Sequence, residues 1–270
     1  MFIRLVVFVL ISVIAIGCGA TPTEKPDSTQ GESQPVVESP KSATAVPPTA
    51  VPPTAVPTTA VPPTAVPPTA VPTPEPISLS GTGDYLSSPF ELQQGIMLLH
   101  ATHNGSGHFA IKVLPEEGDG SELSINAIGA YGGTRAHPVN ADSFMGLKPG
   151  LHRLEISADG DWNAEITQPF WTQGDTIPLS TSGRGDGIIG PVMFNAGTIP
   201  LKGTHDGSSN FAIQVFSADG KDMDLVVNEI GEYQGSNAIR VQKNAIFGLS
   251  PGVHVVVVTA DGEWKVDIGD

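Results

Sequence analysis

Short stretches in which apolar and polar residues alternate follow one another along the chain after residue 76. Trp162, Ala164 and Ile166 alternate with polar residues, and the segment 109–114 alternates in a similar way. A period of two residues places successive side chains on opposite faces of a β-strand. Glycine-rich turns separate these stretches, and none has the periodicity of an amphipathic helix. The pattern predicts an all-β fold.

The pattern occurs twice. Aligning Ser80 with Ser182 places the second copy on the first at a constant offset of 102 residues, without a gap. The Thr-His-Asn-Gly-Ser sequence at 102–106 then matches Thr-His-Asp-Gly-Ser, and Ala-Asp-Gly-Asp-Trp at 158–162 matches Ala-Asp-Gly-Glu-Trp. Self-similarity at a fixed spacing indicates a tandem duplication. The predicted parts are a first repeat, a junction and a second repeat, at 77–168, 169–181 and 182–270.

Each repeat holds roughly seven or eight strand-like stretches joined by short turns. Such strands pair antiparallel, because parallel strands need long connections that usually contain helices. Strands in this number typically form two sheets that pack face to face. We therefore predict two tandem antiparallel β-sandwich or jelly-roll modules after a disordered proline-rich stalk.

The predicted stalk, at 18–76, has a different composition from the repeats. It has no apolar periodicity, and the segment 45–73 is a near-perfect repeat of Ala-Val-Pro-Pro-Thr. Proline fixes its own φ and disfavours the helical region for the residue before it, so the repeat favours extended polyproline II. We interpret the segment as a spacer, and a ligand for a proline-binding partner is the alternative.

The N-terminus has the features of an export signal. Arg4 precedes an apolar run, 5–16, that is too short for a typical membrane-spanning helix and suits a signal-peptide core. The run leads into Ala-Ile-Gly-Cys at 15–18, which resembles the lipobox of bacterial lipoproteins. The resemblance implies that 1–17 is a cleaved signal peptide and that Cys18 carries the lipid, such as palmitate. It also implies a bacterial membrane anchor with the modules outside the cytoplasm.

Charge and cysteine content exclude several kinds of partner and site. The chain has a formal charge of −15 and only 13 Lys and Arg residues, whereas binding a phosphate backbone needs clustered positive charge. We therefore expect no nucleic-acid partner. Cys18 is the only cysteine, which leaves no pair for a disulfide and no cysteine-based zinc site.

The duplicated motifs are similar to those of a known kind of module. The Thr-His-Asp/Asn-Gly-Ser, Phe-Ala-Ile and Ala-Asp-Gly-Asp/Glu-Trp motifs resemble a repeat module of secreted prokaryotic proteins. They are distantly similar to the jelly-roll domains appended to exported peptidases. The resemblance implies a β-sandwich fold and brings no particular chemistry with it.

Histidines recur at matching positions of the two repeats. His103 and His205 end one strand, and His152 and His254 open a later strand, all on the inward-facing parity. Two histidines per module could therefore meet at one rim, and neutral imidazoles bind zinc or copper. The alternative is that each ring hydrogen-bonds only a neighbouring turn.

Acidic turns suggest a second kind of metal site. Asp159 and Asp261 begin duplicated Asp-Gly steps, and Asp161 and Glu263 follow them. Carboxylate oxygens are the ligands that calcium prefers. Asp-Gly between two strands is also a hairpin-turn signal, because glycine accepts a positive φ. Bound calcium and a plain hairpin turn are both consistent with this pattern.

Aromatic residues suggest two further contacts. Trp162 and Trp264 could stack on sugars, but their inward parity favours packing in the core. Phe170 and Trp171 stand in the junction, outside the repeat pattern. They either pack between the modules or form an exposed contact patch for a partner.

No enzyme motif is recognisable in the chain. It has no Gly-x-Ser-x-Gly elbow, phosphate loop or His-Glu-x-x-His, and its duplicated polar residues do not compose a nucleophile, a base and an orienting acid. The sequence predicts a non-catalytic, membrane-anchored, surface-displayed binding or adhesion protein for a glycan, an extracellular polymer or an envelope protein. A structural spacer or envelope-assembly component that binds a protein of the same cell is the alternative. A calcium- or transition-metal-dependent module and an enzyme are further alternatives.

Overall fold

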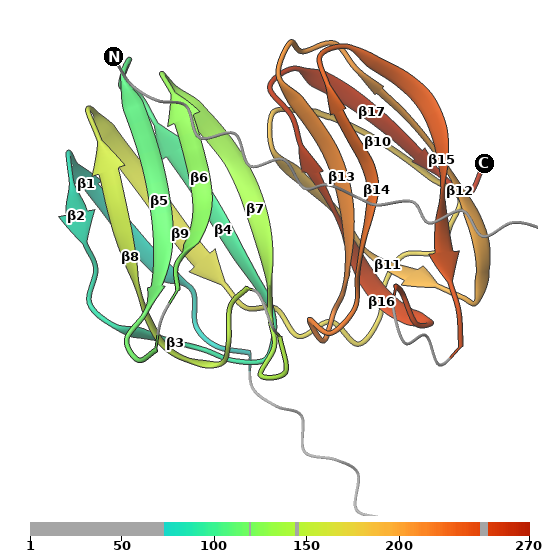
Figure 1. Ribbon diagram of the computed structural model, residues 1–270, viewed down its shortest axis with the longest axis horizontal. Helices are drawn as coiled ribbons and strands as arrows, with labels where there is room; N and C mark the ends of the chain where they lie inside the picture. The colour runs from blue at the N-terminus through green and yellow to red at the C-terminus, as the bar shows by residue number, and fades with distance from the viewer. Residues whose placement is uncertain (1–72, 119, 144–145, 244–247) are drawn as a thin grey trace, which may run out of the picture. The chain divides into compact units, whose positions relative to one another are not determined.

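A computed structural model describes residues 73–118, 120–143, 146–243 and 248–270. The predicted signal peptide, Cys18 and the stalk up to residue 72 lie outside these described residues. The strands form two groups, which we call module 1 (β1 to β9) and module 2 (β10 to β17) (Figure 1). No helix among the described residues is long and apolar enough to cross a membrane. The all-β prediction is confirmed.

The described part of module 1 contains nine strands. They are β1 (Ile77–Thr82), β2 (Tyr85–Leu86), β3 (Phe90–Leu92), β4 (Gly95–His103), β5 (His108–Pro115), β6 (Glu122–Ile128), β7 (Tyr131–Val139), β8 (Gly150–Ala158) and β9 (Asp161–Thr167). Between β2 and β3 stands Pro89, which has no N–H to donate to a sheet. β2 and β3 are therefore two halves of one interrupted strand.

The described part of module 2 contains eight strands. They are β10 (Leu179–Arg184), β11 (Gly187–Phe194), β12 (Gly197–His205), β13 (Asn210–Ser217), β14 (Met223–Ile230), β15 (Tyr233–Val241), β16 (Gly252–Thr259) and β17 (Glu263–Ile268). β11 takes the place of β2 and β3, and its pairing with β16 is irregular around Pro191, the counterpart of Pro89.

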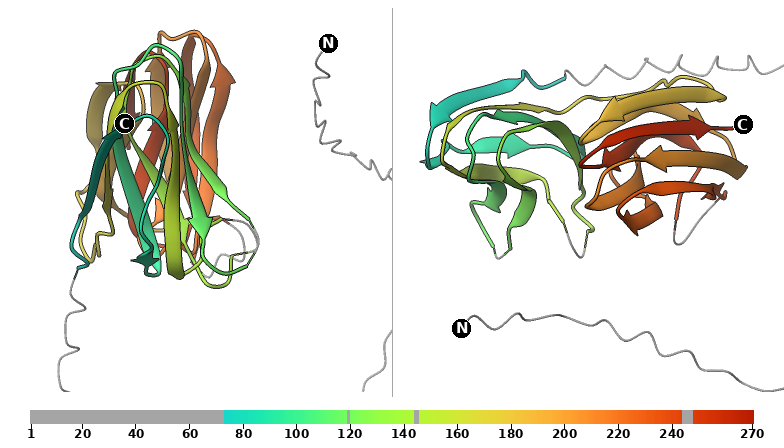
Figure 2. Two further views of the ribbon diagram at one scale, coloured as in Figure 1. Left: turned by 90° about the vertical axis from the view of Figure 1, so that its left-hand side faces the viewer. Right: turned by 90° about the horizontal axis from the view of Figure 1, so that it is seen from above.

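Each module consists of two antiparallel sheets packed face to face (Figure 2). In module 1 the strand orders are β1-β9-β4-β7 and β2-β8-β5-β6, with β3 also paired to β8. In module 2 they are β10-β17-β12-β15 and β11-β16-β13-β14. When β2 and β3 count as one strand, both modules have the strand order of a jelly roll, which is built from two Greek keys. The predicted fold class is confirmed.

The strand register repeats with the sequence. Ile77 opposite Ile166 in module 1 becomes Leu179 opposite Ile268 in module 2, and the remaining pairs of these strands follow at the same offset. Strand β10 begins at Leu179, inside the segment predicted as a junction. It does so because Leu179 packs against the core of module 2.

Inward-facing side chains of both sheets form the core of each module. Trp162, Ala164 and Ile166 of β9 are buried, whereas Asp161, Asn163 and Glu165 between them are exposed. Burying one large apolar side chain contributes roughly 2 kcal/mol to stability. The alternation read from the sequence is therefore the alternation between core and solvent.

Strand β16 departs from this alternation, since Val255, Val256, Val257 and Val258 are all buried. Val256 and Val258 belong to the core of module 2, whereas Val255 and Val257 pack against Ile96 of module 1. This inter-module cluster consists of Ile96, Ala136, Phe216, Val255 and Val257, with Leu98, Trp171 and Ile188 packed against it. Both faces of β16 are therefore covered by apolar side chains.

Asp186 makes a polar contact between the modules. Its carboxylate accepts a hydrogen bond of 2.8 Å from the hydroxyl of Tyr131, and its Oδ2 lies 2.9 Å from Nε of Arg135. Arg135 also donates to the hydroxyl of Thr259 on β16. The Asp186 side chain is only 6% exposed. Burial, together with the nearby Asp186 carboxylate, raises the pKa of Tyr131.

Candidate functional site

Three turns meet at one end of module 1 through a histidine and an aspartate. Nδ1 of His103 lies 2.9 Å from the carbonyl oxygen of Gly129 and therefore carries a hydrogen, because a carbonyl only accepts. Oδ2 of Asp159 accepts from the amides of Ser106 and Gly107 at 3.2 and 2.6 Å. Oδ1 of Asp159 lies 3.2 Å from Nε2 of His103. We call this arrangement the His–Asp clasp.

Module 2 repeats the clasp. Nδ1 of His205 lies 2.9 Å from the carbonyl oxygen of Gly231, and its Nε2 lies 3.2 Å from Oδ1 of Asp261. Burial opposes the ionisation of Asp261, but the amides of Ser209 and Ser208 outweigh it and lower the pKa of this carboxyl. The duplicated histidine and aspartate motifs therefore fix the turns at one end of each sandwich.

The glycines of these motifs are required by close packing. A methyl group on Gly105 would lie 2.6 Å from ring atoms of His103, and one on Gly160 would lie 2.6 Å from the backbone nitrogen of Gly105. Neither glycine has a positive φ. The Asp-Gly step at 159–160 connects β8 and β9, which lie in different sheets. The prediction of a hairpin turn at this step is therefore wrong.

The prediction that two histidines meet at one rim is also wrong. His103 lies beside the turn that precedes β5, whereas His152 pairs with the last residue of β5. A strand of this length spans roughly 25 Å. His205 and His254 are separated by β13 in the same way. Among the residues that the structure describes, no group of three His, Cys, Asp or Glu side chains could hold a metal.

The acidic residues considered as calcium ligands hydrogen-bond or pair within their own module. The two clasp aspartates bind turn amides. Asp161 accepts hydrogen bonds from the side chains of Thr82 and Asn104, which lower its pKa. Glu263 lies 4.0 Å from Arg184 on the neighbouring strand. Within the described ranges, these carboxylates do not converge on a common centre.

The aromatic candidates divide between the core and the inter-module contact. Trp162 and Trp264 are 1% and 6% exposed, and each indole N–H donates to a backbone carbonyl. Their predicted place in the core is confirmed. Trp171 packs against the inter-module cluster, and Phe170 is half-buried. Of the two interpretations of Trp171, packing between the modules is therefore the one that the structure supports.

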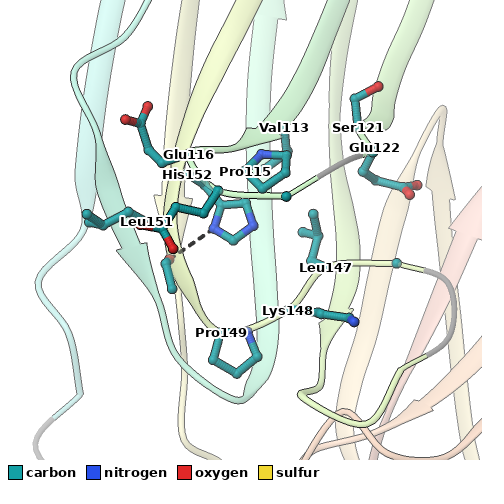
Figure 3. A pocket seen from close by; sticks show the side chains of 15 residues that line it. Val113, Pro115, Glu116, Ser121, Glu122, Leu147, Lys148, Pro149, Leu151 and His152 are labelled. Atoms are coloured by element: carbon teal, nitrogen blue, oxygen red, sulfur yellow. Dashed lines mark hydrogen bonds between the residues drawn. The ribbon is translucent and has the colours of Figure 1, made fainter.

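A cavity opens at the end of module 1 opposite the clasp. Its volume is about 870 Å³, in the range of small-molecule pockets. It lies between residues 115–118 and 120–122, which connect β5 to β6, and the segment 146–152 (Figure 3). Its apolar walls come from Val113, Pro115, Leu147, Pro149 and Leu151. This cavity is the best candidate for a ligand site in the described part of the chain.

His152 is the most deeply buried polar side chain in the lining described, and it is 3% exposed. Its Nδ1 lies 2.9 Å from the carbonyl oxygen of Gly150 and so carries the hydrogen of the neutral ring, which leaves Nε2 as an acceptor. Figure 3 shows the ring among the lining side chains. No described residue hydrogen-bonds to Nε2. The cavity therefore presents an acceptor that has no donor among the described residues.

Carboxylates outnumber positive charges around the cavity. Among the lining residues that the structure describes, Glu116, Glu117 and Glu122 stand together with a single cation, Lys148. Glu116 forms an ion pair with Arg153, a neighbour outside the lining. Burial raises the pKa of Glu122, which is half-buried. Even when Arg153 is counted, the charges near the cavity favour a cation over an anion.

The corresponding end of module 2 is held closed by its own turn. The Ser217 hydroxyl accepts from the amide of Asp222 at 2.8 Å, and Oδ2 of Asp222 accepts from the amide of Ser250 at 2.9 Å. The counterparts of Ser217 and Asp222 in module 1 are Pro115 and Gly120. Pro115 and Gly120 have no side-chain oxygen, so they cannot accept hydrogen bonds like those that hold the 217–222 turn to Ser250 in module 2.

A buried polar group lies between β6 and β7 of module 1. Oγ of Ser124 is 2.6 Å from Nε2 of His137, and Nδ1 of that ring is 3.6 Å from Oε1 of Glu122. Burial, together with the charge of Arg135, lowers the pKa of His137 to about 4. A serine, a histidine and a glutamate follow one another in the order of a hydrolase triad. Ser124 is only 5% exposed, however, and the 3.6 Å between His137 and Glu122 is too long for a hydrogen bond. The arrangement supports a structural contact, not an accessible nucleophile.

Sequence reasoning missed both the cavity and this polar group, because it searched for chemistry shared by the two repeats. Val226 and Ile239 stand in module 2 where module 1 has Ser124 and His137. Positions at which the two repeats differ were the signal in the sequence that could have revealed the cavity and this polar group. No family model matches the chain, and no curated protein matches it either. The assignment of the site therefore rests on its geometry.

Proposed function

We propose that the chain is a membrane-anchored, surface-displayed, non-catalytic binding protein whose ligand enters the cavity of module 1. The observation that carries the proposal is the open cavity with the unpaired acceptor of His152. A pure spacer has no need of such a cavity, and the matching end of module 2 is closed by Asp222. The cavity therefore favours binding over the structural alternative.

The other parts of the proposal come from the sequence. The lipobox-like segment ending at Cys18 supports a lipid anchor, and the proline repeat at 45–73 supports a spacer between the anchor and the modules. The buried Ser124 beside His137 supplies no accessible nucleophile. The proposal is thus a receptor-like lipoprotein, in which module 1 binds and module 2 packs against it.

Retention of ligand by matched variants tests the binding. In the turn-swap variant, 115–122 is replaced by the sequence of 217–224 and Lys148 by serine, so that module 1 receives the groups that close module 2. The full-length wild type and this variant are immobilised and exposed to envelope extracts and polysaccharides. We expect wild type alone to retain material. Equal retention by both, or none by wild type, would overturn the proposed role of the cavity.

Cell fractionation tests the anchor separately. We expect the full-length chain to appear in the membrane fraction and the Cys18→Ala variant to appear in the soluble exported fraction, because the variant has no thiol to acylate. Metabolic labelling with palmitate should mark the wild type only. Unlabelled wild type, or palmitate label that persists in the variant, would contradict the lipid anchor.

A further inference from the structure

The chemistry of the cavity restricts its ligand to a narrow class. We propose that it binds a protonated amine on a short apolar stem, with the amine donating a hydrogen bond to Nε2 of His152. This inference rests on the proposed function and names the ligand class for the same site. Three properties of the lining support it.

The first property is the acceptor. Because Gly150 takes the hydrogen of Nδ1, the neutral ring of His152 has only a lone pair to offer at Nε2. A ligand group at that position must therefore donate. Nε2 of His152 is not among the buried nitrogens without a partner, so it is open to the cavity and free to accept from a ligand.

The second property is the excess of negative charge. Glu117 has no cationic partner among the described residues, and Glu122 is the carboxylate of the lining that is half-buried. A cationic donor is favoured over a hydroxyl, because hydrogen bonds and contacts to a charged partner are about twice as strong as neutral ones. The described side chains around the cavity do not form a metal-binding group, which favours an organic cation over a metal ion.

The third property is the nature of the walls. Leu147, Pro149 and Leu151 supply aliphatic surface. No Phe, Tyr or Trp occurs among the lining residues that the structure describes, and sugar sites typically use such rings as stacking platforms. The walls therefore fit a short alkyl chain better than a sugar ring.

The matching histidine of module 2 supplies an internal control. His254 makes the same hydrogen bond from Nδ1 to the carbonyl of Gly252, at 2.9 Å, but its Nε2 is buried without a hydrogen-bond partner. Burial lowers the pKa of His254. Two histidines in the same backbone setting thus differ in their access to a ligand.

The test follows the histidine ring nitrogens by NMR in the full-length chain. Butylammonium chloride, 1-butanol and sodium butyrate are titrated at matched pH and ionic strength. We expect butylammonium to shift the ring nitrogens of His152 in a saturable way and to leave those of His254 unchanged. Binding of butanol or butyrate should be at least about tenfold weaker. A stronger or equal response to butanol or butyrate would overturn the inference.

Two variants sharpen the result. Glu122→Gln should weaken butylammonium binding about tenfold while the chain remains folded, because a carboxamide lacks the charge. The turn-swap variant should abolish the His152 response. A response that survives the turn swap places the amine elsewhere and overturns the inference.

The inference and the proposed function fail in different ways. If His152 does not respond to butylammonium, but wild type retains envelope material and the turn-swap variant does not, the amine assignment is wrong and the binding function stands. If retention is the same in both proteins, the proposed function is wrong whatever the amine does.

Discussion

The two modules share one fold and differ most at the end that faces away from the clasp. In module 2 the turn at 217–222 is held closed, and it also contacts module 1, since Gln94 donates to the carbonyl of Asp219. A methyl group on Gly220 would lie 2.9 Å from the carbonyl oxygen of Val139. The matching turn of module 1 has no module before it to contact within the described chain. Position in the tandem therefore explains why one end is closed and the other holds a cavity.

The outer faces of strands β8 and β16 show the same effect. Arg153 and Glu155 of module 1 form ion pairs at the surface, with Glu116 and Lys112. Their counterparts, Val255 and Val257, are buried in the inter-module cluster. Duplicated sequences thus diverge where their surroundings differ, and remain alike at the clasp, where their surroundings are the same.

Exchanging residues between the outer faces of β8 and β16 should have the largest effect on the free energy of unfolding. Val257→Glu copies Glu155 but buries a carboxylate in the apolar inter-module cluster, and we expect a loss of about 4 kcal/mol in the free energy of unfolding. The reverse change, Glu155→Val, removes only its exposed pair with Lys112 and should cost less than about 1 kcal/mol. Chemical denaturation measures both. Similar losses for the two variants would show that the faces do not differ as described.

The next largest effect should be a loss of stability in acid that comes from His137, a residue with no histidine counterpart in module 2. Its pKa is about 4 in the folded protein and near 6.5 when unfolded. The unfolded state therefore takes up the proton first, so stability is full above pH 6.5 and falls as the pH drops toward 4, by about 3 kcal/mol.

The control for this pH dependence copies the apolar pair of module 2. The double variant Ser124→Val, His137→Ile carries the residues found at 226 and 239. Unfolding measured between pH 7 and pH 4 should show a flatter loss for the variant than for wild type. Parallel curves would contradict the assignment of this pH dependence to His137.

Disturbing the His–Asp clasp should lower the stability of the two modules by the same amount. Gly105→Ala and Gly207→Ala each push a methyl group against a clasp histidine, and we expect each to cost about 2 kcal/mol of stability. Gly132→Ala is the matched control, because its added methyl group would meet no atom within 4 Å and its φ is not positive. Thermal unfolding of the three variants measures this. A loss confined to one module would refute an equivalent clasp.

The smallest expected effect comes from loosening the closed end of module 2. Asp222→Gly copies Gly120 and removes the acceptor for the amide of Ser250. Loss of one such hydrogen bond costs about 1 kcal/mol, so exchange of the Ser250 amide hydrogen should become about fivefold faster. Hydrogen-exchange NMR gives this rate, and an unchanged rate would mean that another group protects the amide.

The sequence predicted the fold well because the fold depends on local regularities. Alternation in 161–166 marked the core face, and the constant offset marked the second jelly roll. It could not place His103 and His152 at opposite ends of β5, because that separation depends on which strands pair across the sandwich. The one strong local signal of the inter-module contact was the valine run at 255–258. A strand that buries only one face alternates apolar and polar residues, so four valines in a row indicate that both faces are covered.

The contact between modules joins two different surfaces of the repeat, one from β4 and β7 and the other chiefly from β16. A contact of this head-to-tail kind has no symmetry that closes it, and identical copies would add to one another without limit. Here the counterparts of Ile96 and Leu98 are Thr198 and Pro200, and charged residues replace the valines on β8. Among the described residues, module 2 therefore lacks the apolar pair of the β4 surface and module 1 lacks the valines of the β16 surface, so these two surfaces do not propagate the contact to a further copy.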